Sequence, residues 1–147
     1  MIWDAVIEKN DGKKVIRKGV TQHIKIGIDK TRKTTDFYVS VFAFGSNRLR
    51  LVAEYWSDEN TIHIIDIEAK KEDRNCGYGS TAMEILFEIG LHADVEKYTG
   101  YLSEHDLNDP DDPEHKDRLV HFYRKYGFIV DLEEKHIERT VNISNAF

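Results

Sequence analysis

Residues 61–80 read TIHIIDIEAKKEDRNCGYGS, and this stretch decides the fold. Its first part, residues 61–69, is rich in isoleucine and predicts a strand. Two closely spaced glycines, Gly77 and Gly79, follow it. Beyond them, hydrophobic residues recur at helical spacing, which predicts an amphipathic helix over residues 80–92. The stretch is therefore expected to form a strand, a glycine turn and a helix.

The glycine turn, residues 74–80, reads RNCGYGS. Glycines let backbone N–H groups come close to a ligand, and a helix N-terminus offers unpaired donors and the positive end of its dipole. The expected ligand is a phosphate group, and Arg74 adds a permanent cation that suits a pyrophosphate. The turn lacks the Lys-Ser/Thr ending of a Walker loop and one of the three glycines of a dinucleotide fingerprint. A purely structural helix start is the alternative interpretation.

The residues before this stretch look rich in strands, because short runs of β-branched and aromatic residues alternate with turn residues. We expect a first hairpin with strands at residues 3–7 and 14–17. Its turn would lie at residues 10–12, where Asp-Gly tolerates positive φ. Three further strands are expected at residues 23–28, 37–44 and 49–56.

The residues after the first helix predict a strand, a second helix and two closing strands. The strand is expected at residues 97–103. For the helix, Asp112 suits the N-cap, Pro113 the first turn and Gly127 the C-terminal end. The closing strands are expected at residues 128–132 and 137–143. This order predicts an α/β protein of the α+β type, with a mixed, mostly antiparallel central sheet and flanking helices.

Length and charge restrict the function classes. The 147 residues fit one domain, and the net charge of -6 argues against general affinity for nucleic acid and suits a cationic partner. Basic residues, Arg17 among them, crowd the first 33 positions, where we expect solvated hairpin surface. No apolar run approaches the roughly 20 residues needed to cross a bilayer. With one cysteine, Cys76, and no secretory signal at the start, a cytoplasmic location is expected and no membrane partner.

Residues 103–115 hold many carboxylates and two prolines. They lack the spacing of a calcium loop, which needs a glycine at its sixth position and a terminal glutamate. We therefore expect no metal site. Two interpretations stay open for this loop, a solvated connector and a surface that guides a cationic substrate.

A second motif, residues 119–128, reads LVHFYRKYGF. Together with the glycine turn it resembles the two signature blocks of the GNAT N-acetyltransferase superfamily. The turn resembles the acyl-CoA pyrophosphate loop of that family, and the second motif resembles its "FYxKxGF" helix and following strand. The resemblance covers about residues 61–130 and implies a GNAT-like fold with acetyl-CoA as the cofactor.

The resemblance also implies which residues contact the cofactor. Arg74 stands at the family's first motif position, with Gly77 and Gly79 at its two glycine positions. Backbone groups near Ile67 and Ala69 would bind the pantetheine arm as an added strand does. The pyrophosphate would be held by backbone groups of the turn, which are those of Asn75, Cys76, Gly77, Tyr78, Gly79 and Ser80.

The catalytic residues implied are fewer. The acetyl group would pass by direct attack to a primary amine of a small molecule or a protein. Tyr123 matches the tyrosine that in many members protonates the departing thiolate, although its apolar helix stripe also allows a structural role. Tyr126 is the reserve candidate. His63 is the candidate general base, with His121 and bulk water as alternatives.

The first seventy residues match the family less well, because many members have two short helices where hairpins are expected here. The acceptor is therefore not assigned, and the oligomeric state stays open, with a homodimer among the options. A non-catalytic acyl-CoA-binding or regulatory domain is the main alternative function. An interaction protein that shares the architecture is another, since fold does not fix function.

Overall fold

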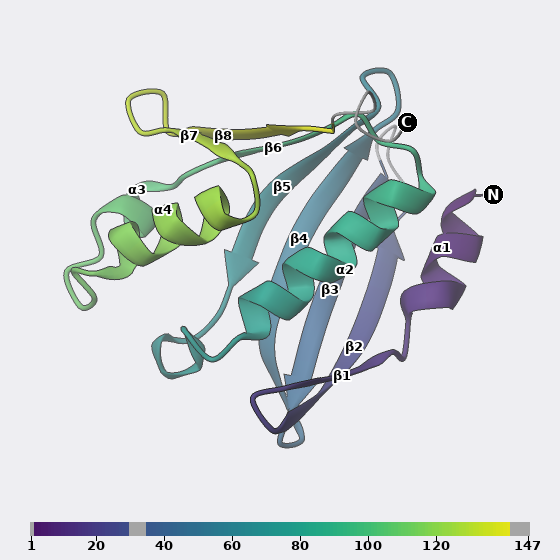
Figure 1. The fold of residues 1–147 in the computed structure, drawn as a ribbon, viewed down its shortest axis with the longest axis horizontal. Helices are drawn as coiled ribbons and strands as arrows, with labels where there is room; N and C mark the ends of the chain where they lie inside the picture. Colours follow the sequence, from purple (N-terminus) through teal and green to yellow (C-terminus); the bar gives the residue numbers. More distant parts are fainter. Residues whose placement is uncertain (1, 30–34, 142–147) are drawn as a thin grey trace. The chain divides into compact units, whose positions relative to one another are not determined.

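The computed structural model describes residues 2–29 and 35–141 of the chain. The chain divides into two compact units, residues 1–95 and 96–147, and each is described by itself (Figure 1). The expected single domain over residues 1–147 stays a prediction. None of the helices in the described ranges is both long and apolar enough to span a membrane.

An antiparallel sheet forms the first unit, and its strands follow one another in chain order. Two of its hairpins close through two-residue turns, Lys18-Gly19 and Phe44-Gly45, in which both residues have positive φ. Such turns match the twist of the strands they join. The strands confirm the expected positions after residue 13 and are β1 (Lys14–Arg17), β2 (Val20–Asp29), β3 (Thr35–Ala43), β4 (Ser46–Trp56) and β5 (Thr61–Glu68).

The strand expected at residues 3–7 is wrong, because the chain forms a helix there, α1 (Ile2–Asn10). Val6 and Asn10 lie one helical turn apart and are both buried, and the Asn10 side-chain amide donates to the Val6 carbonyl oxygen at 3.0 Å. Gly12, with φ 79°, follows the helix C-terminus. The Asp-Gly pair thus ends a helix instead of turning a hairpin, and packing against α2 and β2 decides a segment whose composition favours a strand.

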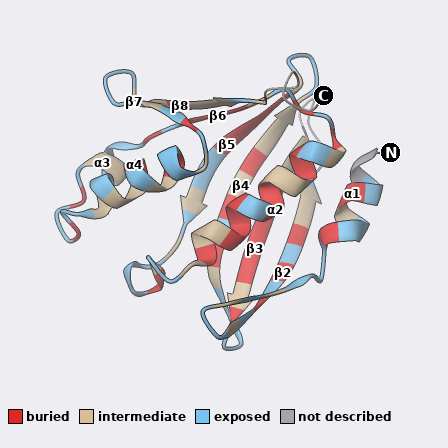
Figure 2. Cartoon of the chain, in the orientation of Figure 1, coloured by how far each residue is buried: buried red, intermediate tan, exposed pale blue. Residues whose placement is uncertain are grey.

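Helix α2 (Tyr78–His92) lies on the sheet against β3 and β4 and also contacts α1. It confirms the predicted helix and begins two residues earlier. Figure 2 shows stretches of β3, β4 and α2 coloured as buried. The buried core between α2 and the sheet includes Val39, Val41, Leu51, Ala53, Ala82, Met83, Leu86 and Ile89.

The second unit combines an antiparallel set of strands, in the order β6-β8-β7, with helices. Its strands confirm the three expected positions within one or two residues at most ends. Residues 142–143 of the last predicted strand lie outside the described residues. The elements are β6 (Lys97–Tyr101), α3 (Glu104–Leu107), α4 (His115–Lys125), β7 (Ile129–Asp131) and β8 (His136–Thr140).

The predicted N-cap of the second helix is wrong. Helix α4 begins at His115, and the Asp112 carboxylate instead accepts two hydrogen bonds from Arg118 Nη2, each 2.6 Å long. Pro113 therefore precedes the helix and does not lie in its first turn. Gly127, with φ 84°, lies at the C-terminal end as predicted. The strong pairing of Asp112 with a guanidinium outweighs the weaker preference for a cap.

Basic residues partner several carboxylates of the acidic loop. Ser103 and Asp106 form a capping box at the start of α3. The Glu104 carboxylate accepts a hydrogen bond from Lys135, which lowers the pKa of that carboxyl. Asp112 pairs with Arg118, as described above. Over residues 2–29 and 35–141, no group of three or more His, Cys, Asp or Glu side chains is placed to hold a metal. The ion pairs of Glu104 and Asp112 neutralise part of the loop's negative charge, and this favours a solvated connector over a surface that guides a cationic substrate.

The hydroxyl of Tyr98 on β6 is expected to make the free energy of unfolding depend on pH in the alkaline range. Burial raises the pKa of its hydroxyl to about 12, although the Arg139 guanidinium nearby acts to lower it. In the unfolded chain the tyrosine pKa lies near 10. The folded state thus holds the phenolic proton more tightly, so the stabilisation is complete below about pH 10 and is lost as the pH rises toward about 12.

We expect this loss to disappear in Tyr98→Phe. Between about pH 9 and about pH 12, the free energy of unfolding of the wild type should fall relative to that of the variant by on the order of 2 kcal/mol. Urea unfolding of both proteins across this range measures the difference. If the difference is the same at both ends of the range, the raised pKa does not contribute to stability.

Candidate functional site

The glycine turn is anchored from the β3–β4 hairpin. After β5 the chain passes through a short 3-10 helix, η1 (Lys71–Asp73), and then enters the turn. Asp73 is buried, and its carboxylate pairs with Arg48 Nη1 at 3.4 Å. Arg48 Nε also donates to the Ala43 carbonyl oxygen at 2.9 Å. Arg48, near the start of β4, therefore links the β3–β4 hairpin to η1, the segment that leads into the glycine turn.

The backbone of the turn is shaped to leave N–H groups free of intrahelical bonds. Asn75 and Gly77 have φ values of 61° and 87°, in the left-handed region. Gly77 is the N-cap of α2, makes no side-chain cap and is followed by a first turn without acidic residues. Because the first intrahelical bond runs from Thr81 N to Gly77 O (3.2 Å), the N–H groups of residues 78–80 have no intrahelical acceptor. This arrangement can bind an anion.

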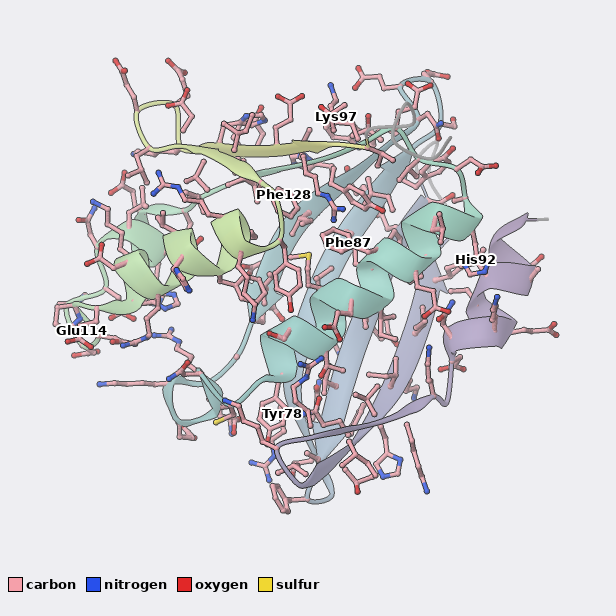
Figure 3. The ribbon with its side chains drawn as sticks, viewed as in Figure 1. Tyr78, Phe87, His92, Lys97, Glu114 and Phe128 are labelled. Carbon is pink, nitrogen blue, oxygen red and sulfur yellow. The ribbon has the colours of Figure 1, made fainter. Side chains whose placement is uncertain are left out.

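The side chains of the turn differ in how far they are exposed. The Tyr78 ring, labelled at the start of α2 in Figure 3, is buried. Cys76 is exposed, and its Sγ lies 3.4 Å from the Arg74 carbonyl oxygen. Arg74 is half-buried at the entrance of the turn. The predicted cofactor residues of the turn thus lie together, with the helix dipole behind them.

Strand β5 contains a bulge that the sequence analysis missed. Ala53 on β4 pairs with Ile64, whereas its neighbour Val52 pairs with Asp66, so Ile65 is an extra residue in β5. A bulge bends a strand and increases its twist, and bulges are common beside active sites. Ile67 follows the bulge while still paired with β4, and residue 69 lies just beyond the end of the strand. The bulge therefore sets the direction of the segment predicted to hold the pantetheine arm.

His63 lies in β5 before the bulge and belongs to a cluster on β4 and β5. Its ring is buried and stacks on Trp56, with ring centroids 4.6 Å apart and planes inclined by 16°. It pairs in register with Glu54, whose carboxylate accepts a hydrogen bond from Trp56 Nε1 at 2.8 Å. This environment holds the imidazole against the Trp56 ring. His121, the alternative base, is exposed on α4.

Tyr123 belongs to α4 in the second unit, whereas the turn belongs to the first. Its side chain is buried and meets the rings of Phe122 and Phe128 edge-on, with centroids 5.6 and 5.5 Å away. The Phe128 N–H donates to the Tyr123 carbonyl oxygen at 3.1 Å and links helix to strand. The ring is therefore fixed by packing. The reserve candidate, Tyr126, is half-buried with the Lys125 ammonium over its ring.

Arg17 lies at the turn, although the sequence analysis placed it on solvated hairpin surface. Its Nε donates to Thr81 Oγ1 at 3.1 Å, in the first turns of α2. The two residues are 64 positions apart in the chain. Only the pairing of β1 with the sheet brings them together, so no local sequence signal could have found this contact.

No family model matches the chain. Among curated proteins, the Bacillus subtilis protein YocC, which is described as uncharacterised, is 38% identical over 89 residues. The match covers 60% of this chain and 47% of YocC, so it spans about half the length of that relative. It assigns no activity.

Several solved structures resemble the fold of the chain at low sequence identity. The PaiA N-acetyltransferase from Thermoplasma acidophilum, in complex with coenzyme A, has a TM-score of 0.56 at 16% identity and covers 71% of this chain and 60% of that one. Nourseothricin acetyltransferase has a TM-score of 0.57 at 13% identity and covers 95% of this chain and 93% of that one. The chain therefore has the fold of the GNAT acetyltransferases, which confirms the predicted fold class.

Proposed function

We propose that this chain is an N-acetyltransferase that moves the acetyl group of acetyl-CoA to a primary amine. The observation that carries the proposal is the start of α2, where a left-handed Gly77 caps the helix without a side-chain bond. The same fold holds coenzyme A in the PaiA N-acetyltransferase. The net charge of -6 favours a cationic acceptor.

The cofactor residues of the proposal form one continuous segment. The guanidinium of Arg74 and the backbone N–H groups of residues 75–80 would bind the pyrophosphate. Backbone groups of Ile67 and Ala69 would bind the pantetheine arm as an added strand does. These contacts would orient the thioester, and good orientation alone lowers such a barrier by about 7–11 kcal/mol.

Two side chains would move protons. Acetyl-CoA supplies an acetyl thioester, whose C–S bond breaks as the C–N bond to the amine forms. The Tyr123 hydroxyl would donate a proton to the leaving sulfur, and His63 would accept the proton that the amine loses. Each such proton transfer typically contributes about 10²–10⁴-fold to the rate. The close packing of Tyr123 between Phe122 and Phe128 also suits a core tyrosine, which keeps a non-catalytic acyl-CoA-binding domain as the second candidate.

The first test of the proposal is ligand binding. Acetyl-CoA at 100 times its dissociation constant should add about 2.7 kcal/mol to the free energy of unfolding, a rise in Tm of roughly 5–10 °C for a chain of this length. A thermal-shift series followed by calorimetry measures this. A thiol-release screen over primary amines then separates an enzyme from a binding domain. A chain that gives no heat and no shift at millimolar acetyl-CoA would contradict both candidates.

A further inference from the structure

The Arg17 side chain crosses the start of α2. A Cβ added to Gly77 would lie 2.8 Å from Arg17 Cδ, so the aliphatic part of the arginine passes directly against the N-cap glycine. Its guanidinium donates from Nε to Thr81 Oγ1 (3.1 Å) and from Nη2 to the Glu84 carboxylate. Thr81 Oγ1 in turn donates to the Gly77 carbonyl oxygen at 3.2 Å. The arginine is therefore bonded to the N-terminal part of the helix at two points.

This position is electrostatically unusual. A helix N-terminus carries partial positive charge and favours anions, so a guanidinium bonded to residues 81 and 84, in the first two turns of α2, adds positive charge where an anion is already favoured. In the described chain the charge is offset by Glu84, which lies in the next helical turn and has a half-exposed side chain (51%). A guanidinium and free N–H groups on one helix end together suit a phosphate better than either does alone.

A neighbouring ion pair shows what a purely structural link looks like. Lys13, which directly precedes β1, pairs through Nζ with Glu88 at 2.9 Å and also ties the N-terminal hairpin, formed by β1 and β2, to α2. That pair lies one helical turn further from the glycine turn than Glu84. It fastens the same elements together without placing a cation at the helix N-terminus, so it provides a matched control.

We propose that Arg17 is a ligand of the cofactor's diphosphate, and that Glu84 holds its guanidinium ready while the site is empty. This inference rests on the proposed function and adds a residue from the N-terminal hairpin to the cofactor site. When the diphosphate binds at residues 75–80, Arg17 exchanges the Glu84 carboxylate for a phosphate oxygen. Its bond to Thr81 keeps the guanidinium at the helix N-terminus during the exchange.

Calorimetry with CoA and with dephospho-CoA, which keeps the diphosphate and lacks the 3′-phosphate, tests the inference on the full chain. Arg17→Ala should weaken both ligands by the same factor, roughly 10- to 100-fold for the loss of charge-assisted bonds. Arg17→Lys keeps the charge but loses the forked donor geometry of the guanidinium, so its affinity should lie between those of the wild type and Arg17→Ala. Lys13→Ala should bind like the wild type. Glu84→Gln should bind CoA more tightly, because the guanidinium no longer leaves a carboxylate.

The other outcomes overturn the inference in distinguishable ways. Unchanged affinity in Arg17→Ala, with wild-type binding intact, would reduce the arginine to a structural link like Lys13 and leave the proposed function standing. A loss for CoA alone would assign it to the 3′-phosphate instead of the diphosphate. Equal losses in Arg17→Ala and Lys13→Ala would trace the effect to the hairpin's attachment. A wild type that binds neither ligand would overturn the proposed function, and this inference with it.

Discussion

Gly79→Val is expected to abolish most of the affinity for CoA while the chain stays folded. A side chain at this position, the second residue of α2, would keep phosphate away from the N–H groups of the first turn. Losing two charge-assisted hydrogen bonds at about 1.5–3 kcal/mol each weakens binding by at least about 100-fold. Valine and glycine differ by less than about 0.5 kcal/mol in helix propensity, so stability should change little.

Gly79 is the better position for this experiment than Gly77. Gly77 has a positive φ, and an added Cβ would collide with Arg17, so its replacement would disturb folding and binding together. Leu91→Val, at an exposed position in the last turn of the same helix, is the matched control and should melt and bind like the wild type. Calorimetry with CoA and thermal melts of each variant give both quantities. Wild-type affinity in a folded Gly79→Val protein would place the phosphate elsewhere.

Tyr123→Phe is expected to slow acetyl transfer by about 10²–10⁴-fold, with a smaller loss if water can supply the proton. The substitution keeps the ring that packs against Phe122 and Phe128 and removes only the hydroxyl. CoA affinity should therefore stay near that of the wild type. Steady-state thiol release, with an amine found in the screen described above, measures the change in kcat.

Tyr126→Phe is the control for this second experiment, because it removes the hydroxyl of the reserve candidate, which follows the last residue of α4. We expect its turnover to match that of the wild type. A core tyrosine without a chemical role predicts a different result for Tyr123→Phe, with a lower Tm and an undiminished rate. That result would remove Tyr123 from the mechanism and favour the non-catalytic candidate.

Local patterns predicted the elements around the site well. The strand before the glycine turn and the helix after it form where expected, and the second helix ends before Gly127 as expected. Each is specified by neighbours in the chain, through helical spacing or the conformational needs of a glycine. The left-handed backbone at Gly77 agrees with the conformational freedom that glycine brings to the turn.

Most of the errors and omissions come from contacts between residues far apart in the chain, and one comes from a side-chain pair only six positions apart. The segment around Val6 has the composition of a strand, yet packing on α2 and β2 makes it a helix. Asp112 has the identity of a cap, yet Arg118 binds its carboxylate. The bulge at Ile65 and the position of Arg17 depend on strand pairing, which composition and spacing do not encode locally.

The Arg48–Asp73 pair has a consequence for how this site changes over evolutionary time. The pair fixes η1, which precedes the turn, through residues that lie outside the turn itself. The groups that the turn would present to an anion are backbone N–H groups, which every residue except proline carries. Selection for binding can therefore act on the path of the backbone while the side chains at positions such as 75 and 76 change. Under such selection, we expect the backbone conformation of the turn to be kept longer than the identities of its side chains. The chain resembles the PaiA N-acetyltransferase and nourseothricin acetyltransferase structures at 16% and 13% identity, while no family model matches it.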